Sequence, residues 1–347
     1  MIFLRADSST TSPSSSRLLY LIDTLGKRFL GCLFITKKFP LGYDHLMNSH
    51  TNQIAGASPS RGIIMIVLGV SIAAFTGVTM KILGDQISAA QVAWFRFAGM
   101  SIILAPYLIW RYGLKGLKPA RPVVQIIRGL TMAAGTSLFV MGSQTVDYAD
   151  AIAILYAYPF LLVIIAVLFL GERANWTVWV GITSGFLGVL LVIRPEFGKI
   201  NIGTVYIFFC AIVIGIQLAL NRKLGAISPP LITAFFGALC ATITLTLLLP
   251  GTWQPIPNEA WLYIGLLIFA GTINQVLLVY AFVYADASTL APFTYFEIVS
   301  AVIFGYLFFD TMPSTLSWIG IFLITTGGLY VARALHLNNI SRRTPKI

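Results

Sequence analysis

The sequence predicts an all-α membrane protein with ten transmembrane helices in two inverted five-helix repeats. Three observations lead to this fold class: the composition, a regular series of apolar segments, and an internal repeat. Of the 347 residues, 57% are apolar and only 10% are charged, and the mean hydropathy is +0.85. Because soluble chains carry about 25% charged residues, this chain has too little polar material to cover a water-exposed surface. We therefore expect most of it to lie in a lipid bilayer.

Apolar segments of membrane-spanning length begin soon after residue 61 and alternate with short polar gaps. A helix crosses the bilayer with about 20 mostly apolar residues. The ten predicted spans are Ile63–Met80, Ala89–Trp110, Val123–Val146, Ala151–Gly171, Trp176–Ile193, Ile202–Leu220, Leu231–Leu249, Ala260–Val283, Ser288–Phe309 and Leu316–Ala334. The gaps are too short for a soluble domain, so we expect any function to be carried out within the membrane.

The predicted organisation has four parts. Residues 1–60 differ in composition from the rest, with a Ser/Thr/Pro-rich stretch at 8–16, and we interpret them as a poorly ordered tail or a start codon assigned too early, with Met47 a more natural start. The first repeat covers residues 61–200 and the second 201–336. Residues 337–347 form a second tail.

The distribution of lysine and arginine predicts the orientation and explains the net charge of +11. With the N-terminus in the cytoplasm, twelve of these residues in the spans' flanks and gaps fall on the cytoplasmic side. Only Lys81, Arg194 and Lys199 fall on the other side. The positive-inside rule therefore places both termini in the cytoplasm. Basic residues at these positions indicate membrane topology, and we expect no nucleic acid partner.

An internal repeat relates the two halves. Tyr148-Ala-Asp-Ala recurs as Tyr284-Ala-Asp-Ala, and Trp179-x-Gly-Ile recurs as Trp318-x-Gly-Ile, in the same order. Each copy contains five predicted spans, and because five is odd the second copy enters the membrane from the opposite side. Inverted repeats are typical of transporters in which two related halves exchange inward-open and outward-open states around a site near the bilayer midplane.

Further residues give a specific resemblance. The fourth span ends in the apolar run 166–170 followed by Gly171-Glu172, with Pro159 thirteen residues before that glutamate. In the second half Glu297 stands at the matching proline position. With these features residues 61–334 resemble the EamA-type branch of the drug/metabolite transporter superfamily. The resemblance implies a secondary transporter in the plasma (inner) membrane that moves a small metabolite by an ion gradient or exchange. It also implies a cavity lined by the third, fourth, eighth and ninth spans, with the first and sixth.

Two charged residues lie deep in predicted spans. Glu297 is nine residues into the ninth span, near the bilayer centre, where an ionisable group is costly and indicates function. Its carboxylate could pair with a cationic or zwitterionic substrate, such as an amino acid or an S-adenosylmethionine-like solute, or exchange a proton. Arg96, eight residues into the second span, favours instead an anionic or nucleotide-like substrate, or balances Glu297. A structural role remains open for both.

Other polar side chains within spans complete the predicted site. They are Tyr295, Asn274, Gln275, Tyr156, Tyr158 and Gln217. Together they suggest a polar and aromatic cavity, although such residues also join helices to one another. Pro159 and Pro292 remove backbone hydrogen bonds inside the fourth and ninth spans, and we expect hinges there.

Two further features are interpreted as structural. Arg128 lies near the end of its span and is expected to extend towards the membrane interface. Small residues at GxxxG-like spacing predict close helix packing between the halves or between protomers, which makes a homodimer possible. They are Gly181, Gly185, Gly188, Gly320, Gly327 and Gly328.

The sequence argues against several other classes of protein. No histidine falls inside a predicted span, and the chain has no HExxH, GxSxG or GxxxxGK[ST] motif. We therefore expect no catalytic residues, no metal and no cofactor, and a small-molecule substrate and the lipid bilayer as partners. The alternatives to a transporter are a non-transporting membrane scaffold and an intramembrane enzyme.

Overall fold

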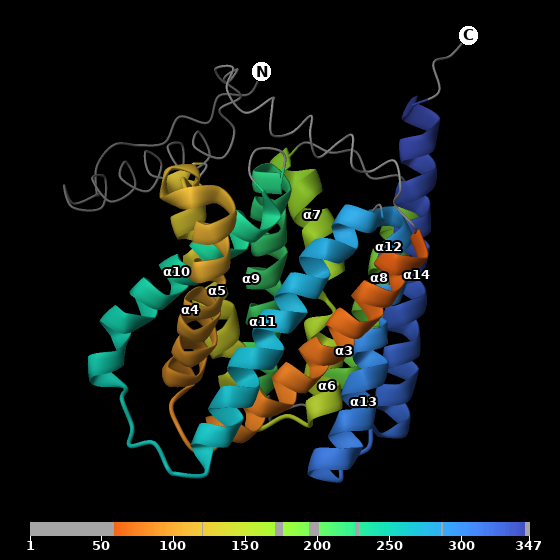
Figure 1. The fold of residues 1–347 in the computed structure, drawn as a ribbon. Helices are drawn as coiled ribbons and strands as arrows, with labels where there is room; N and C mark the ends of the chain where they lie inside the picture. The colour runs from red at the N-terminus through yellow and green to blue at the C-terminus, as the bar shows by residue number, and fades with distance from the viewer. Residues whose placement is uncertain are drawn as a thin grey trace, which may run out of the picture. The chain divides into compact units, whose positions relative to one another are not determined.

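A computed structural model describes residues 59–119, 121–170, 176–193, 201–225, 229–285 and 287–343, which belong to a unit that spans residues 56–347. Residues 1–58 of the predicted N-terminal tail and the Gly171-Glu172 motif lie outside the described residues. All regular structure within these ranges is helical (Figure 1). The helices are α3 (Pro59–Gly84), α4 (Ala89–Gly116), α5 (Pro122–Ser143), α6 (Tyr148–Leu155), α7 (Tyr158–Leu170), α8 (Trp176–Ile193), α9 (Ile202–Gly225), α10 (Pro230–Leu248), the 3₁₀ turn Leu249–Gly251, α11 (Ala260–Tyr284), α12 (Ala287–Thr294), α13 (Phe296–Phe309) and α14 (Thr315–Arg343).

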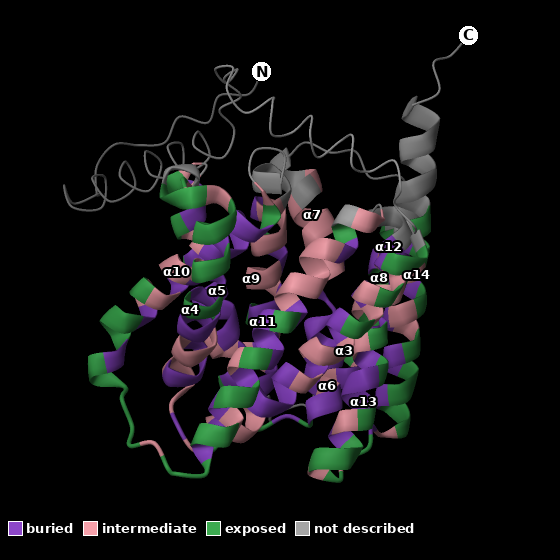
Figure 2. Cartoon of the chain, in the orientation of Figure 1, coloured by how far each residue is buried: buried purple, intermediate pink, exposed green. Residues whose placement is uncertain are grey.

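The helical segments have the length and composition of membrane spans. Among the described residues, eight segments are long and apolar enough to cross a bilayer, and the apolar helices 179–193 and 315–331 are shorter. Exposed residues lie on outward faces of the helices, as on α11 and α14 in Figure 2. Many of them are large and apolar, and Leu247 and Phe269 are 78% and 66% exposed. Exposed apolar surface on this scale requires a lipid environment. The all-α membrane class predicted from the sequence is confirmed.

Local sequence signals explain where several helices begin. Ser88 forms a capping box with Gln91 at the start of α4: the Ser88 hydroxyl accepts from the Gln91 backbone N–H, and the Gln91 side chain accepts from that of Ser88. The same Gln91 amide donates to the Gln254 carbonyl at 2.8 Å and accepts from the Gln254 N–H at 3.0 Å. Gln91 therefore connects α4 to the segment that precedes α11.

The predicted fourth and ninth spans are each divided into two helices. Between α6 and α7 the Ala157 N–H bonds to the Ile154 carbonyl, and Pro159, the second residue of α7, has no N–H to donate. Between α12 and α13 a single residue, Tyr295, separates the helices. Both spans are therefore interrupted in the region where a proline hinge is expected, and the hinge motion itself stays a prediction. Pro292 lies inside α12, three residues before the break.

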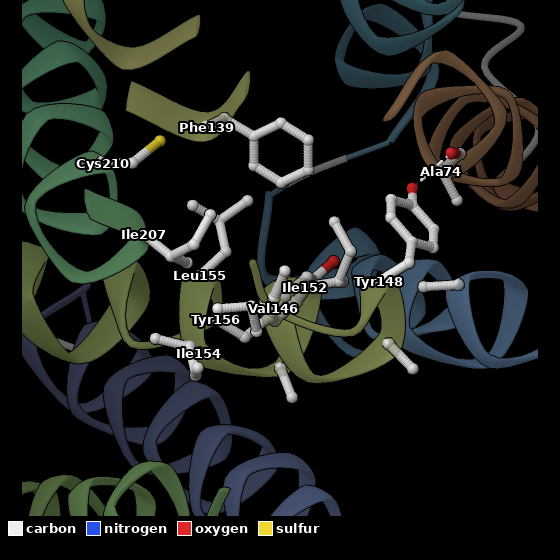
Figure 3. Close-up of a cluster of buried hydrophobic side chains, with 14 of the residues drawn as sticks. Ala74, Phe139, Val146, Tyr148, Ile152, Ile154, Leu155, Tyr156, Ile207 and Cys210 are labelled. Atoms are coloured by element: carbon white, nitrogen blue, oxygen red, sulfur yellow. Dashed lines mark hydrogen bonds between the residues drawn. The ribbon is translucent and has the colours of Figure 1, made fainter. Parts of the chain in front are cut away.

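Helix α6 is buried on all sides by protein. Tyr148, Ile154 and Tyr156 are each at most 1% exposed. Figure 3 shows α6 side chains packed against Ile207 and Cys210 of α9 and Phe139 of α5, while the Tyr148 hydroxyl points to the Ala74 carbonyl of α3, to which it donates. The first half of the fourth span is thus fixed at the centre of the helices.

Helices α8 and α14 pack closely through glycines. A Cβ atom added to Gly181 would lie 3.0 Å from the Gly327 carbonyl oxygen, and one added to Gly327 would lie 2.9 Å from that of Gly181. The corresponding distances between Gly188 and Gly320 are 2.7 and 2.6 Å. The helices run antiparallel, since the earlier glycine of each contacts the later glycine of the other. The sequence predicted that this glycine face packs either between the two halves or between protomers. In the structure it packs between two helices of the same chain.

Two other pairs of helices from different halves lie side by side: α3 packs along α11, as Figure 1 shows, and α5 packs along α9. Arg128 of α5 contributes to the second contact. It is only 3% exposed, its Nε donates to Asn221 Oδ1 at 2.5 Å, and its Nη1 donates to the Thr233 carbonyl at 2.6 Å. The prediction that Arg128 extends to the membrane interface is therefore wrong, because protein acceptors on α9 and α10 satisfy its guanidinium.

Candidate functional site

A cavity of about 200 Å³ lies between helices of both halves. It is smaller than the roughly 300–1,000 Å³ of most small-molecule sites. The lining residues come from α3, α4, α5, α6, α9, α11 and α13. These helices include each span that the family resemblance implies, and in addition the second span, α4.

Five of the predicted site residues line this cavity. They are Arg96, Gln217, Asn274, Gln275 and Glu297. They come from four helices that are distant in the sequence, so the fold brings them to one space. The three predicted tyrosines are not among the lining residues. Their rings form a cluster instead, in which the Tyr156 centroid lies 5.4 Å from that of Tyr158 and 5.3 Å from that of Tyr295.

Glu297 lies in the first turn of α13, directly after the helix break. Its Oε2 atom is 2.9 Å from the Tyr156 hydroxyl oxygen. That hydroxyl is also 2.5 Å from the carbonyl oxygen of Thr294, the last residue of α12. Because the Ile298 N–H bonds to the Tyr295 carbonyl at 3.1 Å, the Thr294 carbonyl is released from the usual helical hydrogen bond and accepts from a side chain. Glu297 and the helix break therefore share one neighbour, Tyr156.

Arg96 reaches the cavity from α4. Its Nη1 donates to the Thr136 hydroxyl at 3.3 Å and lies 3.6 Å from the sulfur of Met80. Its side chain passes beside Gly271 of α11, where a Cβ atom would lie in ordinary contact, 3.7 Å from Arg96 Cγ and Nε. Its hydrogen-bond partners in the described part of the chain are neutral. The guanidinium can therefore donate to an anionic group that enters the cavity.

A buried amide adds hydrogen-bonding capacity on α11. Asn274 is 5% exposed, and its Oδ1 atom has no hydrogen-bond partner among the described residues. Buried polar atoms are normally paired, so this oxygen can accept from a ligand in the cavity. Gln275 and Gln217 line the same space from α11 and α9. The cavity thus offers a cation, a carboxyl group and neutral amides.

Sequence analysis missed the apolar part of the lining. Met80, Met100 and Met132 line the cavity together with Phe97 and Phe139. Helical spacing could have indicated Met100, which lies four residues after Arg96 and so on the same helix face. Met132 lies four residues before Thr136, which also lines the cavity, but no residue of α5 was among the predicted site residues.

Each helix break is packed against a glycine of a neighbouring helix. A Cβ atom on Gly185 of α8 would overlap the ring of Phe160, which follows Pro159 in α7. A Cβ atom on Gly328 of α14 would overlap the hydroxyl of Tyr295, the residue at the other break. An aromatic ring is therefore seated in a glycine pocket at both breaks.

Comparisons with known proteins agree with this arrangement. A chain of known crystal structure has the same fold, with a TM-score of 0.56 and 16% identity, over 82% of this chain and 98% of that one. The S-adenosylmethionine uptake transporter of Rickettsia prowazekii is 28% identical over 273 residues, which cover 78% of this chain and 92% of that protein.

Other relatives have different names. The riboflavin transporter of Rhizobium johnstonii is 28% identical, over 79% of this chain and 93% of that protein. The pseudopaline exporter of Pseudomonas aeruginosa is 25% identical, over 78% and 96% respectively. The profile of the EamA-like transporter family matches twice, over residues 60–194 and 201–333. The chain therefore belongs to the EamA-like transporter family of the drug/metabolite transporter superfamily, and it is a multi-pass membrane transporter of a small metabolite.

Proposed function

We propose that this protein is a secondary transporter that carries a small zwitterionic metabolite with an α-amino-acid group, such as S-adenosylmethionine or an amino acid. The substrate binds in the central cavity, and two inverted five-helix halves open it alternately to each side of the plasma membrane. Transport is driven by an ion gradient or by exchange. Residues 61–200 and 201–336 are the two halves, and both termini lie in the cytoplasm.

The glycine contacts between α8 and α14 support two inverted halves. In the sequence repeat Gly181 corresponds to Gly320, and Gly188 corresponds to Gly327. Exchanging the halves turns the contact of Gly181 with Gly327 into that of Gly320 with Gly188, which is the other observed contact. The same exchange turns the packing of α3 on α11 into that of α9 on α5. Antiparallel helices related in this way are the pattern of an inverted repeat.

A count of ten spans follows if α8 and α14, the helices with the shorter apolar segments, also cross the bilayer. Helices α6 with α7, and α12 with α13, then each form one broken span. Both broken spans meet near the cavity, where irregular backbone in transporters is tolerated. The possible homodimer predicted from the sequence remains a separate proposal, because the glycine face that suggested it is used between α8 and α14.

The observation that carries the substrate class is the presence of Arg96 and Glu297 in one cavity. Arg96 can bind a carboxylate, Glu297 can bind an ammonium group, and Asn274 Oδ1 can accept a further hydrogen bond. A zwitterion satisfies both charges, whereas a simple anion or cation leaves one charge uncompensated in a low-dielectric site. The methionine and phenylalanine side chains then face the rest of the substrate. Relatives named as S-adenosylmethionine uptake transporters have a substrate of this class.

Uptake by reconstituted protein tests the proposal. Liposomes that contain the wild type are offered labelled S-adenosylmethionine, amino acids, riboflavin and a nucleotide, with and without a proton gradient. We expect uptake of a zwitterion that is at least tenfold lower in both Arg96→Gln and Glu297→Gln. Arg61→Gln and Glu259→Gln are matched controls, because both positions are exposed and lie outside the cavity lining.

The outcomes separate the alternatives. Uptake of a nucleotide that depends on Arg96 but not on Glu297 would replace the zwitterion with an anionic substrate. Uptake that is unchanged in both cavity variants would contradict the proposed site while leaving transport established.

A further inference from the structure

Tyr156 has a single hydroxyl proton and two oxygen neighbours at hydrogen-bond distance. The Thr294 carbonyl oxygen is 2.5 Å away and Glu297 Oε2 is 2.9 Å away. A carbonyl oxygen can only accept, and an ionised carboxylate can only accept. If Glu297 were ionised, one proton would have to serve two acceptors. Both short distances are satisfied when Glu297 is protonated, donates to Tyr156, and Tyr156 donates to Thr294.

We propose that Tyr156 is a positioning residue that couples the protonation of Glu297 to the break between α12 and α13. When Glu297 is protonated, its O–H donates to the Tyr156 oxygen and the Tyr156 O–H holds the Thr294 carbonyl. When the Glu297 proton leaves through the cavity, the Tyr156 O–H turns to the carboxylate. The Thr294 carbonyl then loses its partner, and the break is free to change its geometry.

The position of Tyr156 suits this role. It is the residue that ends α6, so it lies at the break of the fourth span, and its ring lies 5.3 Å from that of Tyr295, the residue at the break of the ninth span. It is fully buried, which keeps water from replacing its hydrogen bonds. One hydroxyl group therefore connects the broken spans of both halves with the carboxyl group in the cavity.

Other charged or titratable groups near Glu297 could affect the pH at which its carboxyl group loses its proton. Arg96 from α4 interacts with its charge, and Tyr156 from α6 shares a hydrogen bond with it. The charge of Glu297 in turn acts on the hydroxyl groups of Tyr148 from α6 and Tyr158 from α7. Helix α3 also packs on α13 and carries Arg61 and Lys81; Lys81 lies 5.2 Å from the centre of the Phe309 ring, at the opposite end of α13. Helix α6 also packs on α13 and carries Asp150, and the chain has twelve Asp and Glu residues in all, so the infrared band of Glu297 is identified by its loss in Glu297→Gln.

The inference also deepens the proposed function, on which its transport consequence rests. An ammonium group of a substrate binds the ionised carboxylate, so substrate and proton exclude each other at Glu297. Arrival of the substrate then releases one proton from Glu297 and redirects the Tyr156 hydroxyl. The helix break thereby responds to whether the site holds a proton or a substrate.

Infrared titration of the full-length protein in liposomes tests the coupling without any substrate. In the difference spectrum between the wild type and Glu297→Gln, we expect a carboxylic acid C=O stretch at acidic pH that disappears as the pH is raised. In Tyr156→Phe the band should shift to higher frequency, because the carboxyl group loses its acceptor. Tyr148→Phe is the matched control, since it removes from the same helix a buried hydroxyl that donates to the Ala74 carbonyl, and its band should match the wild type.

Hydrogen–deuterium exchange gives the second readout. In the wild type the peptide over residues 290–298 should exchange faster once the carboxyl band has disappeared, whereas in Tyr156→Phe it should exchange fast at every pH. An identical band and identical exchange in Tyr156→Phe and the wild type would overturn the proposal. So would the lack of any titrating band that depends on Glu297. If the band and its shift are found but no zwitterion is transported, the proposed substrate fails and the coupling stands.

Discussion

Arg128 of α5 and Asn221 of α9 are joined by a hydrogen bond from the guanidinium Nε to the side-chain oxygen, 2.5 Å long, between two helices of different halves. The same guanidinium donates to the Thr233 carbonyl of α10. One buried arginine therefore connects three helices. Gly237 provides the space for it, because a Cβ atom there would overlap Nη1 of Arg128.

Replacement of Arg128 by alanine should destabilise the protein. Asn221 and the Thr233 carbonyl would both lose a donor, and leaving buried polar groups unpaired costs about 1–3 kcal/mol for each group. We expect a clear fall in the thermal unfolding midpoint in detergent, measured by tryptophan fluorescence. Arg111→Ala on the exposed end of α4 is the control, and an unchanged midpoint in Arg128→Ala would contradict the structural role.

Alanine at Gly188 or Gly320 should separate α8 from α14. The added Cβ atom would lie 2.6–2.7 Å from a backbone carbonyl oxygen of the partner helix, which side-chain rotation cannot relieve. Overpacking of this kind costs about 1–3 kcal/mol, and we expect a lower unfolding midpoint. The control is Gly265→Ala on α11, where a Cβ atom would have no neighbour within 4 Å. Equal midpoints for the three variants would exclude the close contact.

Gly77 and Tyr148 should be energetically coupled. A Cβ atom on Gly77 would overlap the Tyr148 hydroxyl, which points along α3 to Ala74 (Figure 3). Gly77→Ala should therefore lower the free energy of unfolding. Adding Tyr148→Phe removes the overlapping hydroxyl and should restore part of that energy. The recovery is only partial, because two ring carbons still lie 3.1 Å from the new Cβ position. Unfolding of the four chains of a double-mutant cycle should give a coupling of about 0.5–3 kcal/mol. If the changes in unfolding free energy of the two single variants simply add up in the double variant, the contact between Gly77 and Tyr148 is contradicted.

Thr136→Val should weaken substrate binding without changing the shape of the cavity. The Thr136 hydroxyl accepts from Arg96 at 3.3 Å, and valine removes this acceptor at similar volume. Loss of one hydrogen bond is worth about 0.5–1.5 kcal/mol, so we expect the KM for uptake to rise about 2- to 10-fold with little change in maximal rate. Thr242→Val is the control, because that hydroxyl donates to the Ala238 carbonyl of its own helix. A rise in KM of equal size in the control would remove the special role of Thr136.

Some residues of the cavity could be predicted from the sequence alone, and others could not. Glu297, Arg96 and the amides Asn274, Gln275 and Gln217 were found from the sequence because polar groups deep in apolar spans are costly. Tyr156 was also predicted as a site residue, but it does not line the cavity. Its contacts with Thr294 and Glu297 were not predicted, because they depend on a helix break 138 residues away. The burial of Arg128 was missed because its acceptors lie on other helices.

The sequence by itself determined the bilayer as the surroundings of the chain, the approximate spans, the repeat and most of the polar residues of the cavity. These follow from composition, segment length and local pattern, which each segment carries alone. Only the tertiary structure decided which helix faces meet, where the fourth and ninth spans break, and which polar side chains share a cavity. The physical reason is that lipid is as apolar as the protein interior, so the two faces of a membrane helix differ little in hydrophobicity. The rotation of each helix is instead set by close packing, as where Gly181 meets Gly327, and by hydrogen bonds between helices, as where Tyr156 reaches Thr294.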